Sequence, residues 1–344
     1  MNEKLKLNIM KLLELIHFHK SSSKKDIFIF TTFRSGSTWL AEIIESQPRI
    51  KFSGAPPLSP DKVEYFNNIC NYTDIIKPRW QYCNLDIKES ELIKEYISKI
   101  KNGKILNSRR YGNLFSKNHN FITDRTVIRY LRSCALIDWF CDNFDDYTIF
   151  LSRHPIPTSL SRLKIWNRND KIKYWGYYIE DFLKSDYYTS TFLTNDLLKY
   201  VNYKYKVSND LEKFVLSWCL EFLPIMKKMN KLKKNNNFII LTYEEMVLNT
   251  DKVIQLLSNK LQLDNRDRMF RQAKIPSTTV RHSDENTRIK FENGDYGQRY
   301  LIEKWKKEID INQEKKIFEI IDKFNIDMYN YGNVLPKDNY FNFT

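Results

Sequence analysis

The chain has 344 residues, of which 42% are hydrophobic, so it can bury a substantial core as one large domain or two modest ones. The formal net charge of +14 is compatible with nucleic acid, an anionic membrane or a small polyanionic ligand, but without a zinc-finger, RNA-recognition or basic-zipper signature we expect no nucleic acid partner. Five cysteines without a CxxC pair argue against a zinc site and a disulfide framework, and they favour a cytoplasmic protein.

The first 25 residues are predicted to form an N-terminal amphipathic helix on the domain surface. Apolar residues at Ile9, Leu12, Leu13 and Ile16 recur at helical spacing, and this apolar run is too broken for a signal-peptide core. The alternative is an anchor at a membrane surface. No later stretch has the length of a membrane span, and without an internal repeat or a linker residues 26–344 are expected to form a single domain.

Three strand-then-helix units follow in chain order. Each pairs a short apolar strand with a helical pattern, namely 26–32 with 37–46, 145–152 with 157–166, and 236–242 with 243–261. Short apolar strands that alternate with helices are typical of a parallel sheet covered on both faces. The sequence therefore predicts an α/β fold with a central parallel sheet flanked by helices.

Further helices and two irregular segments complete the prediction. Apolar residues at helical spacing predict core helices over 125–143, 211–223 and 312–325. The stretches 167–208 and 264–300 are polar, and they show no clear period. We expect irregular lid segments there, because long irregular stretches in compact domains usually carry function.

A small, polar and basic turn joins the first strand to its helix. It consists of Arg34, Ser35, Gly36, Ser37 and Thr38. Gly36 lets the backbone approach a ligand, the amides of Ser37, Thr38 and Trp39 can open the helix as an anion site, and Arg34 adds a permanent charge. A simple N-cap needs fewer such residues. Because the turn has neither the GxxxxGK[ST] nor the GxGxxG spacing, it predicts another kind of phosphate or sulfate site.

The second unit carries a similar pair of groups. Arg153 falls just past the strand end, and Ser161 lies eight residues later in a helix whose start is marked by Pro155 and Pro157. A guanidinium and a hydroxyl at one strand-helix junction can bind a second oxyanion. In an open parallel sheet both junctions lie at the carboxyl ends of the strands, where ligands bind.

The two oxyanion motifs together resemble those of the sulfotransferases that use 3′-phosphoadenosine 5′-phosphosulfate (PAPS) and release 3′,5′-phosphoadenosine (PAP). "TTFRSGSTWL" at 31–40 is similar to the family's 5′-phosphosulfate loop, and "SRHPIPTSLS" at 152–161 is similar to its 3′-phosphate motif. "LTYEEMV" at 241–247 resembles the segment whose tyrosine lies near the adenine. "FENGDYGQRYLIEKW" at 291–305 is a weaker match to the family's C-terminal segment.

This resemblance implies a P-loop-like sulfotransferase fold and a role for each matching residue. The 5′-phosphosulfate would be held by Arg34, Ser35, Gly36, Ser37 and Thr38. Arg153 and Ser161 would hold the 3′-phosphate, while Trp39 and Tyr243 would border the adenine. Arg34 would also be catalytic, because its charge can stabilise the leaving phosphate oxygen during in-line transfer. No metal is implied.

The general base that takes the acceptor's proton is marked less clearly. Ala55 stands where many relatives of this family have a glutamate. The segment 114–126 offers a histidine, His119, and an acid, Asp124, with Arg125 as a possible charge partner. We take His119 as the candidate base because its ordinary pKa suits the role. Glu64 is a further candidate.

The C-terminal match departs from the family's pattern. Glu292 and Asn293 stand where many relatives have Arg-Lys before the first glycine of this segment. Arg288 or Lys290 is therefore expected to reach the 3′-phosphate instead, unless the segment binds nothing.

The resulting hypothesis is a cytoplasmic sulfotransferase that moves a sulfuryl group from PAPS to a hydroxyl or amine of a small molecule or carbohydrate. Two alternatives stay open. One is a non-catalytic nucleotide-binding protein that kept the donor site and lost the base, as Ala55 suggests. The other is a small-molecule phosphotransferase, which the lack of a Gly-Lys pair disfavours.

Overall fold

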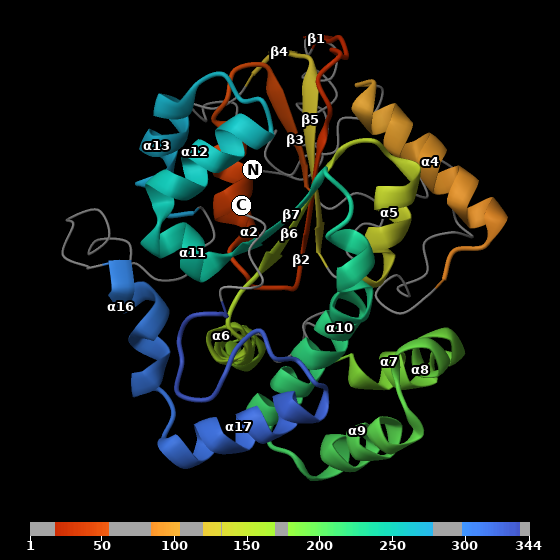
Figure 1. The fold of residues 1–344 in the computed structure, drawn as a ribbon, viewed down its shortest axis with the longest axis vertical. Helices are drawn as coiled ribbons and strands as arrows, with labels where there is room; N and C mark the ends of the chain where they lie inside the picture. Colours follow the sequence, from red (N-terminus) through yellow and green to blue (C-terminus); the bar gives the residue numbers. More distant parts are fainter. Residues whose placement is uncertain are drawn as a thin grey trace.

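The computed structural model describes residues 18–54, 84–103, 120–131, 133–168, 178–277 and 298–337. At its centre five strands lie in the order β3-β5-β2-β6-β7, and every neighbouring pair is parallel (Figure 1). Their bounds are β2 Ile27–Thr31, β3 Ile50–Gly54, β5 Arg125–Leu131, β6 Tyr147–Ser152 and β7 Phe238–Thr242. The predicted α/β fold with a central parallel sheet is confirmed.

Helices cover both faces of this sheet (Figure 1). One face carries α2 (Ser37–Glu45), α11 (Tyr243–Leu248), α12 (Thr250–Lys260) and α13 (Arg266–Ala273). The other face carries α4 (Ile87–Lys101), α5 (Ile137–Asn143), the short 3-10 turn Cys134–Leu136, and α10 (Asp210–Leu232). Because both faces are covered, every residue of β2, β6 and β7 is buried.

A second group of helices lies toward the carboxyl ends of the strands, in the lower half of Figure 1. It comprises α6 (Pro155–Arg168), α7 (Ile179–Lys184), α8 (Asp186–Phe192), α9 (Asn195–Val207), α16 (Gln298–Glu303), the 3-10 turn Lys304–Lys307 and α17 (Ile311–Lys323). The predicted helices over 211–223 and 312–325 are confirmed as parts of α10 and α17.

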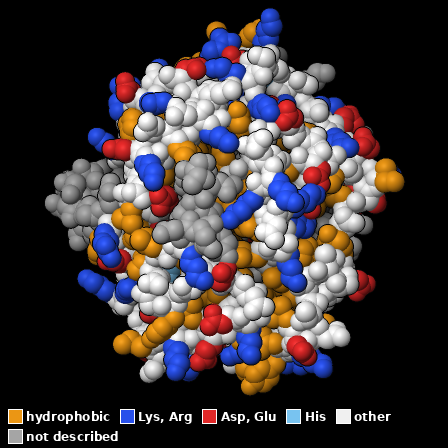
Figure 2. Space-filling model, in the orientation of Figure 1, with side chains coloured by type: hydrophobic (Ala, Val, Ile, Leu, Met, Phe, Trp, Pro, Cys, Tyr) orange, Lys and Arg blue, Asp and Glu red, His pale blue; other side chains and the backbone are white. Residues whose placement is uncertain are grey.

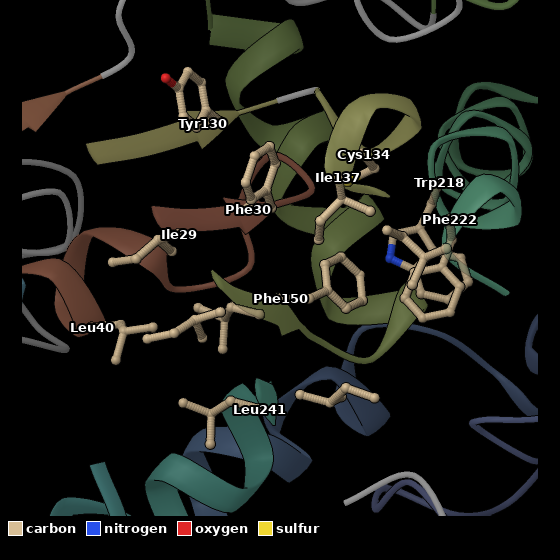
Figure 3. Close-up of a cluster of buried hydrophobic side chains, with 14 of the residues drawn as sticks. Ile29, Phe30, Leu40, Tyr130, Cys134, Ile137, Phe150, Trp218, Phe222 and Leu241 are labelled. Atoms are coloured by element: carbon tan, nitrogen blue, oxygen red, sulfur yellow. The ribbon is translucent and has the colours of Figure 1, made fainter. Parts of the chain in front are cut away.

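The core joins the sheet to α10. Figure 3 shows Phe150 of β6 facing Trp218 and Phe222 of α10. The rings of Trp218 and Phe222 are stacked with centroids 4.6 Å apart, and Phe150 lies 5.5 Å from Phe222. These aromatic contacts fix α10 against the sheet and so fix the helices that pack on α10.

The prediction of a continuous helix over 125–143 is wrong. Residues 125–131 form β5, which is inserted between β3 and β2, and only Ile137–Asn143 is α-helical. A strand that is buried on both faces is apolar at most positions, so its side chains also satisfy a helical pattern. The β-branched run Thr126, Val127 and Ile128 favours the extended form.

The predicted irregular segments are largely helical where the structure describes them. Within 167–208, α7, α8 and α9 cover most of residues 179–207, and within 264–300 the chain forms α13 and begins α16. The pattern analysis missed these short helices because their starts are set by N-cap side chains and not by a long apolar period. The Ser185 side chain accepts a hydrogen bond from the Tyr188 amide, and the Thr194 side chain accepts one from the Leu197 amide. Residues 169–177 and 278–297 lie outside the described residues.

The N-terminal helix prediction falls mostly on residues 1–17, which lie outside the described residues. Within the remainder of 1–25, Phe18–His19 forms the strand β1, which pairs in parallel with β4 (Ile122–Thr123) and is not helical. In the described part of the chain no helix is long and apolar enough to cross a membrane.

Positive charges are spread over the face of the molecule that Figure 2 shows. Figure 2 shows Lys and Arg side chains over most of one face, interspersed with Asp and Glu. In the described part of the chain many surface charges are paired, as in Lys231 with Asp142 at 2.5 Å and Lys164 with Glu308 at 2.6 Å. Exposed pairs of this kind add little stability, so they mainly keep the surface solvated.

Candidate functional site

The loop between β2 and α2 has a backbone that few residues can adopt. Arg34 has φ +72° and Gly36 has φ +87°, both in the left-handed region. A Cβ atom on Gly36 would lie 2.5 Å from Cδ2 of Tyr243, closer than any real Cβ contact. Thr32 and Ser35, both fully buried, share a hydrogen bond of 2.7 Å between their hydroxyls. The loop is therefore a tight, preformed turn.

The loop ends at the N-terminus of α2, which was predicted to present amides to an anion. The Trp39 amide donates to the Gly36 carbonyl at 3.0 Å, so it closes the first turn and is not directed at a ligand. The Ser37 amide is the first of the helix and has no acceptor within it. Amides at this position favour an anion, as does the positive end of the helix dipole.

Arg34 and Ser161 meet at this loop. The Arg34 Nε donates to the Ser161 Oγ at 2.9 Å, which joins the first strand-helix unit to α6 of the second. Burial, and then the neighbouring charge of Arg153, lower the pKa of Arg34 to about 10. At neutral pH Arg34 is still protonated, so the positively charged guanidiniums of Arg34 and Arg153 lie near each other in partly buried surroundings.

Arg153 lies between the loop and Tyr243. Its Nη1 donates to the Arg34 carbonyl at 3.3 Å, and its guanidinium stands 4.3 Å from the centre of the Tyr243 ring. In the described parts of the chain neither Arg34 nor Arg153 forms a salt bridge with a carboxylate. A dianionic ligand would relieve the repulsion between the two guanidiniums, so the charges here suit a phosphate or a sulfate.

Tyr243 and Trp39 form an aromatic wall beside the two arginines. Their rings meet edge to face with centroids 6.0 Å apart, and Tyr243 also covers Gly36. Trp39 is only 8% exposed, and its indole Nε1 has no hydrogen-bond partner among the described residues. The wall can border a planar base, with Tyr243 as the more accessible ring.

Two arginines at the loop were missed by the sequence analysis. Arg129 of β5 donates from Nη1 to the Thr38 Oγ1 at 2.7 Å, at the first turn of α2. Arg162 of α6 donates from Nε to the Phe33 carbonyl at 3.1 Å. Arg129 was overlooked because its strand was taken for a helix, whereas Arg162 is next to a predicted site residue, Ser161, and could have been found from that position.

The buried acid Glu244, next to Arg153, links three segments of the chain by hydrogen bonds. Glu244 accepts from the His154 amide through Oε1 and from the Tyr329 hydroxyl through Oε2, both at 3.0 Å. Burial raises the pKa of Glu244, opposed by these hydrogen bonds and by the charge of Arg153. The β6 end that carries Arg153 is thus fixed to the start of α11 and to the C-terminal segment.

His154 belongs to the same support. Its ring is fully buried and stacked on Trp305 at 4.9 Å, and its Nε2 lies 3.2 Å from the Asn333 carbonyl. Its Nδ1 accepts from the Ile156 amide, so Nε2 carries the proton that the carbonyl accepts. Burial lowers the pKa of His154 to about 3, which leaves the ring neutral and structural.

Asp124 and Arg125 do not take part in this site. Asp124 directly precedes β5 and Arg125 is its first residue, so both lie at the amino-terminal edge of the sheet, about 20 Å from its carboxyl edge at the rise of a strand. Asp124 there pairs with Arg49 at 2.6 Å, and Arg125 donates to the Leu261 carbonyl at 2.6 Å. Neither Asp124, the other candidate acid of this segment, nor its possible charge partner Arg125 therefore lies with the groups around Arg34. His119, Arg288, Lys290, Ala55 and Glu64 lie outside the described residues, as do Glu292 and Asn293.

Comparison with known proteins gives one sequence family. A family model described as a sulfotransferase domain matches residues 24–330. No curated protein matches the sequence.

Among solved structures the chain is similar to several sulfotransferases. A mouse sulfotransferase complexed with PAP is 18% identical over 92% of this chain and 88% of that chain, with a TM-score of 0.40. The sulfotransferase domain of the Synechococcus PCC 7002 olefin synthase is 13% identical over 90% and 99% of the two chains, with a TM-score of 0.40. A Mycobacterium avium sulfotransferase is 11% identical over 91% and 79%, with a TM-score of 0.39.

Proposed function

Because the chain belongs to the sulfotransferase domain family, we propose that it transfers a sulfuryl group from PAPS to a hydroxyl or amine of a small molecule or carbohydrate. The observation that carries the choice of donor is the juxtaposition of Arg34, Arg153 and Ser161 at the carboxyl edge of the sheet. These groups come from two neighbouring strand-helix units, and a ligand with phosphates at both ends of an adenosine would satisfy both.

The two ends of the donor would be bound by different elements. The loop residues Ser35, Gly36, Ser37 and Thr38, with Arg34, would bind the 5′-phosphosulfate at the start of α2. Arg153 and Ser161 would bind the 3′-phosphate, and the Trp39 and Tyr243 wall would border the adenine. The support for this assignment is that all of these groups adjoin one another without any movement of the chain. Arg288 is the remaining proposed donor contact.

In the proposed reaction the acceptor oxygen or nitrogen attacks sulfur as the bond from sulfur to the 5′-phosphate oxygen breaks. Negative charge then develops on that phosphate oxygen, and the acceptor's proton passes to a general base, for which His119 is the candidate. Arg34 stabilises the developing charge because its guanidinium is already held by Ser161 and needs little reorganisation. Arg129, through Thr38, adds a further positive charge at the start of α2.

The proposal keeps the cytoplasmic location that the cysteine pattern favours. The three described cysteines, Cys134, Cys141 and Cys219, are free thiols, and burial raises the pKa of each. Reactivity follows the thiolate form, so these cysteines are expected to serve packing rather than chemistry.

Calorimetric titration with PAP tests the donor assignment. The wild type is expected to bind PAP with a micromolar or lower dissociation constant, and Arg153→Ala at least tenfold more weakly, because a charge-assisted contact to phosphate is lost. Lys164→Ala is the matched control, since it removes a positive charge from the exposed side of the nearby helix α6 and should bind as the wild type does. Failure of the wild-type protein to bind PAP would contradict the proposed donor.

A further inference from the structure

A buried ion pair lies directly behind the anion-binding loop. Arg162 of α6 donates from Nη1 to Oε1 of Glu221 at 3.0 Å and from Nη2 to Oε2 at 2.7 Å, and Glu221 belongs to α10. Each residue is only 4% exposed. A buried pair of this kind gives little net stability compared with well-packed apolar residues of the same volume, because both charges lose their hydration. Its role is therefore not explained by stability alone.

The remaining nitrogen of the Arg162 guanidinium is bonded to the loop. Its Nε donates to the Phe33 carbonyl at 3.1 Å, and this carbonyl belongs to the peptide that precedes Arg34. The peptide that follows Arg34 is held in turn by Arg153, which donates to the Arg34 carbonyl at 3.3 Å. Both peptides flanking Arg34 are thus fixed by an arginine.

Arg34 needs this restraint because its φ of +72° is unfavourable for a residue with a side chain. Such a conformation is strained and persists only where the surroundings hold it. It directs the Arg34 side chain toward Ser161. If the Phe33 carbonyl were released, the Arg34 peptide could relax, and the guanidinium would lose its position.

Glu221 determines what Arg162 can do. The carboxylate occupies both terminal nitrogens of the guanidinium and neutralises its charge, so only Nε is directed at the loop. Lysine could keep the charge beside Glu221, but its single nitrogen lacks the planar fork that bonds to the carboxylate and the loop at once. Arg162 can therefore hold the loop in position without adding its positive charge to the ligand site.

We propose that the Arg162–Glu221 pair is a positioning device that holds Arg34 in the left-handed conformation required to bind the 5′ half of the nucleotide. This inference rests on the proposed function. Arg162 is a positioning residue in this scheme: it touches no ligand, and it acts through Arg34. Its loss should therefore weaken contacts at the 5′ end and spare those at the 3′ end.

Nucleotides that carry a phosphate at only one end report separately on binding at the 5′ and 3′ ends of the site. We would titrate the full chain with PAP, adenosine 5′-phosphate and adenosine 3′-phosphate, using the wild type, Arg162→Lys, Arg34→Ala and the double variant. Arg162→Lys is expected to bind PAP and adenosine 5′-phosphate about tenfold more weakly and adenosine 3′-phosphate as the wild type does. In the Arg34→Ala background Arg162→Lys should have no further effect, because the two residues act as a unit. Lys164→Ala, on the same helix, should leave all three affinities unchanged.

A second variant guards against a folding defect. Arg162→Met combined with Glu221→Leu replaces the pair with apolar residues, so it should keep its thermal stability while losing the bond to the Phe33 carbonyl. It should show the same selective loss of adenosine 5′-phosphate binding. Wild-type affinity for adenosine 5′-phosphate in both variants, equal weakening at both ends, or additive losses with Arg34→Ala would overturn the inference. A wild-type protein that binds no PAP would instead remove the proposed function on which it rests.

Discussion

Gly36 meets two separate constraints, one from its backbone and one from a neighbour. Its φ of +87° is unfavourable for any other residue, and the Tyr243 ring occupies the space where a Cβ would lie. Tyr243 packs in turn on the Arg153 guanidinium. A change at Gly36 is therefore expected to disturb Arg153, at the proposed 3′-phosphate end of the site, as well as the loop.

Gly36→Ala should lower the free energy of unfolding by about 1–3 kcal/mol and weaken PAP binding at least tenfold, because Tyr243 must move and Arg153 loses its packing. Urea unfolding and calorimetry would measure the two effects. Gly332→Ala is a matched control: Gly332 also has a positive φ, +77°, but nothing lies within 4 Å of its Cβ position. Equal effects of the two substitutions on PAP binding would contradict the role given to Tyr243.

At the scale of elements, the start of α11 connects the proposed donor site to the C-terminal segment. Glu244 is the first residue after Tyr243, and its carboxylate accepts from the His154 amide and the Tyr329 hydroxyl. His154 in turn packs on Trp305. The strand ends that carry Arg153 and Tyr243 are thus supported by residues far along the chain, namely Trp305 at the end of the weak C-terminal match and Tyr329 beyond it.

Tyr329→Phe should lower the free energy of unfolding by about 1–2 kcal/mol, because it leaves a buried Glu244 oxygen without its donor. Thermal or urea unfolding would measure the change. Tyr331→Phe provides a control two residues away, where the ring is 49% exposed and the stability should hardly change. A loss for Tyr329→Phe no larger than that for Tyr331→Phe would argue against a supporting role for Glu244.

At the scale of the whole molecule, the amino edge of the sheet contains a cluster of neighbouring acids. The carboxyl edge holds the arginines of the proposed donor site. The amino edge holds the neighbouring acids Asp26 and Asp146, which are joined to Lys101. Burial raises the pKa of Asp26 to about 6, the charge of Asp146 adds to this, and Lys101 opposes it.

This shift predicts how stability depends on pH. Because the folded protein binds the Asp26 proton more tightly than the unfolded chain, the contribution to stability is complete below about pH 4 and is lost as pH rises through 6. The wild type should lose on the order of 2 kcal/mol relative to Asp26→Asn between pH 4 and 7, as measured by urea unfolding at several pH values. Asp145→Asn is the control, since Asp145 is exposed and Lys25 lowers its pKa, so this variant should keep the decrease. Parallel pH profiles for the wild type and Asp26→Asn would show that Asp26 does not titrate in this range.

The sequence by itself determined the elements and residues whose signal is local. The loop around Arg34 and the strand end at Arg153 were recognisable because a strand-to-helix turn rich in small and basic residues has a chemistry of its own. The helical period of 211–223 was likewise sufficient, since one helix face is buried along its whole length.

Only the tertiary structure decided what lies between these segments. Residues 125–131 are a strand because β2 and β3 offer hydrogen bonds on both sides, and this pairing brings Arg129 to Thr38. Arg162 holds the Phe33 carbonyl across 129 positions of sequence because α6 packs on α10, where Glu221 fixes the guanidinium. Such contacts depend on strand order and helix packing, which arise from the whole chain and leave no periodic mark in any one segment.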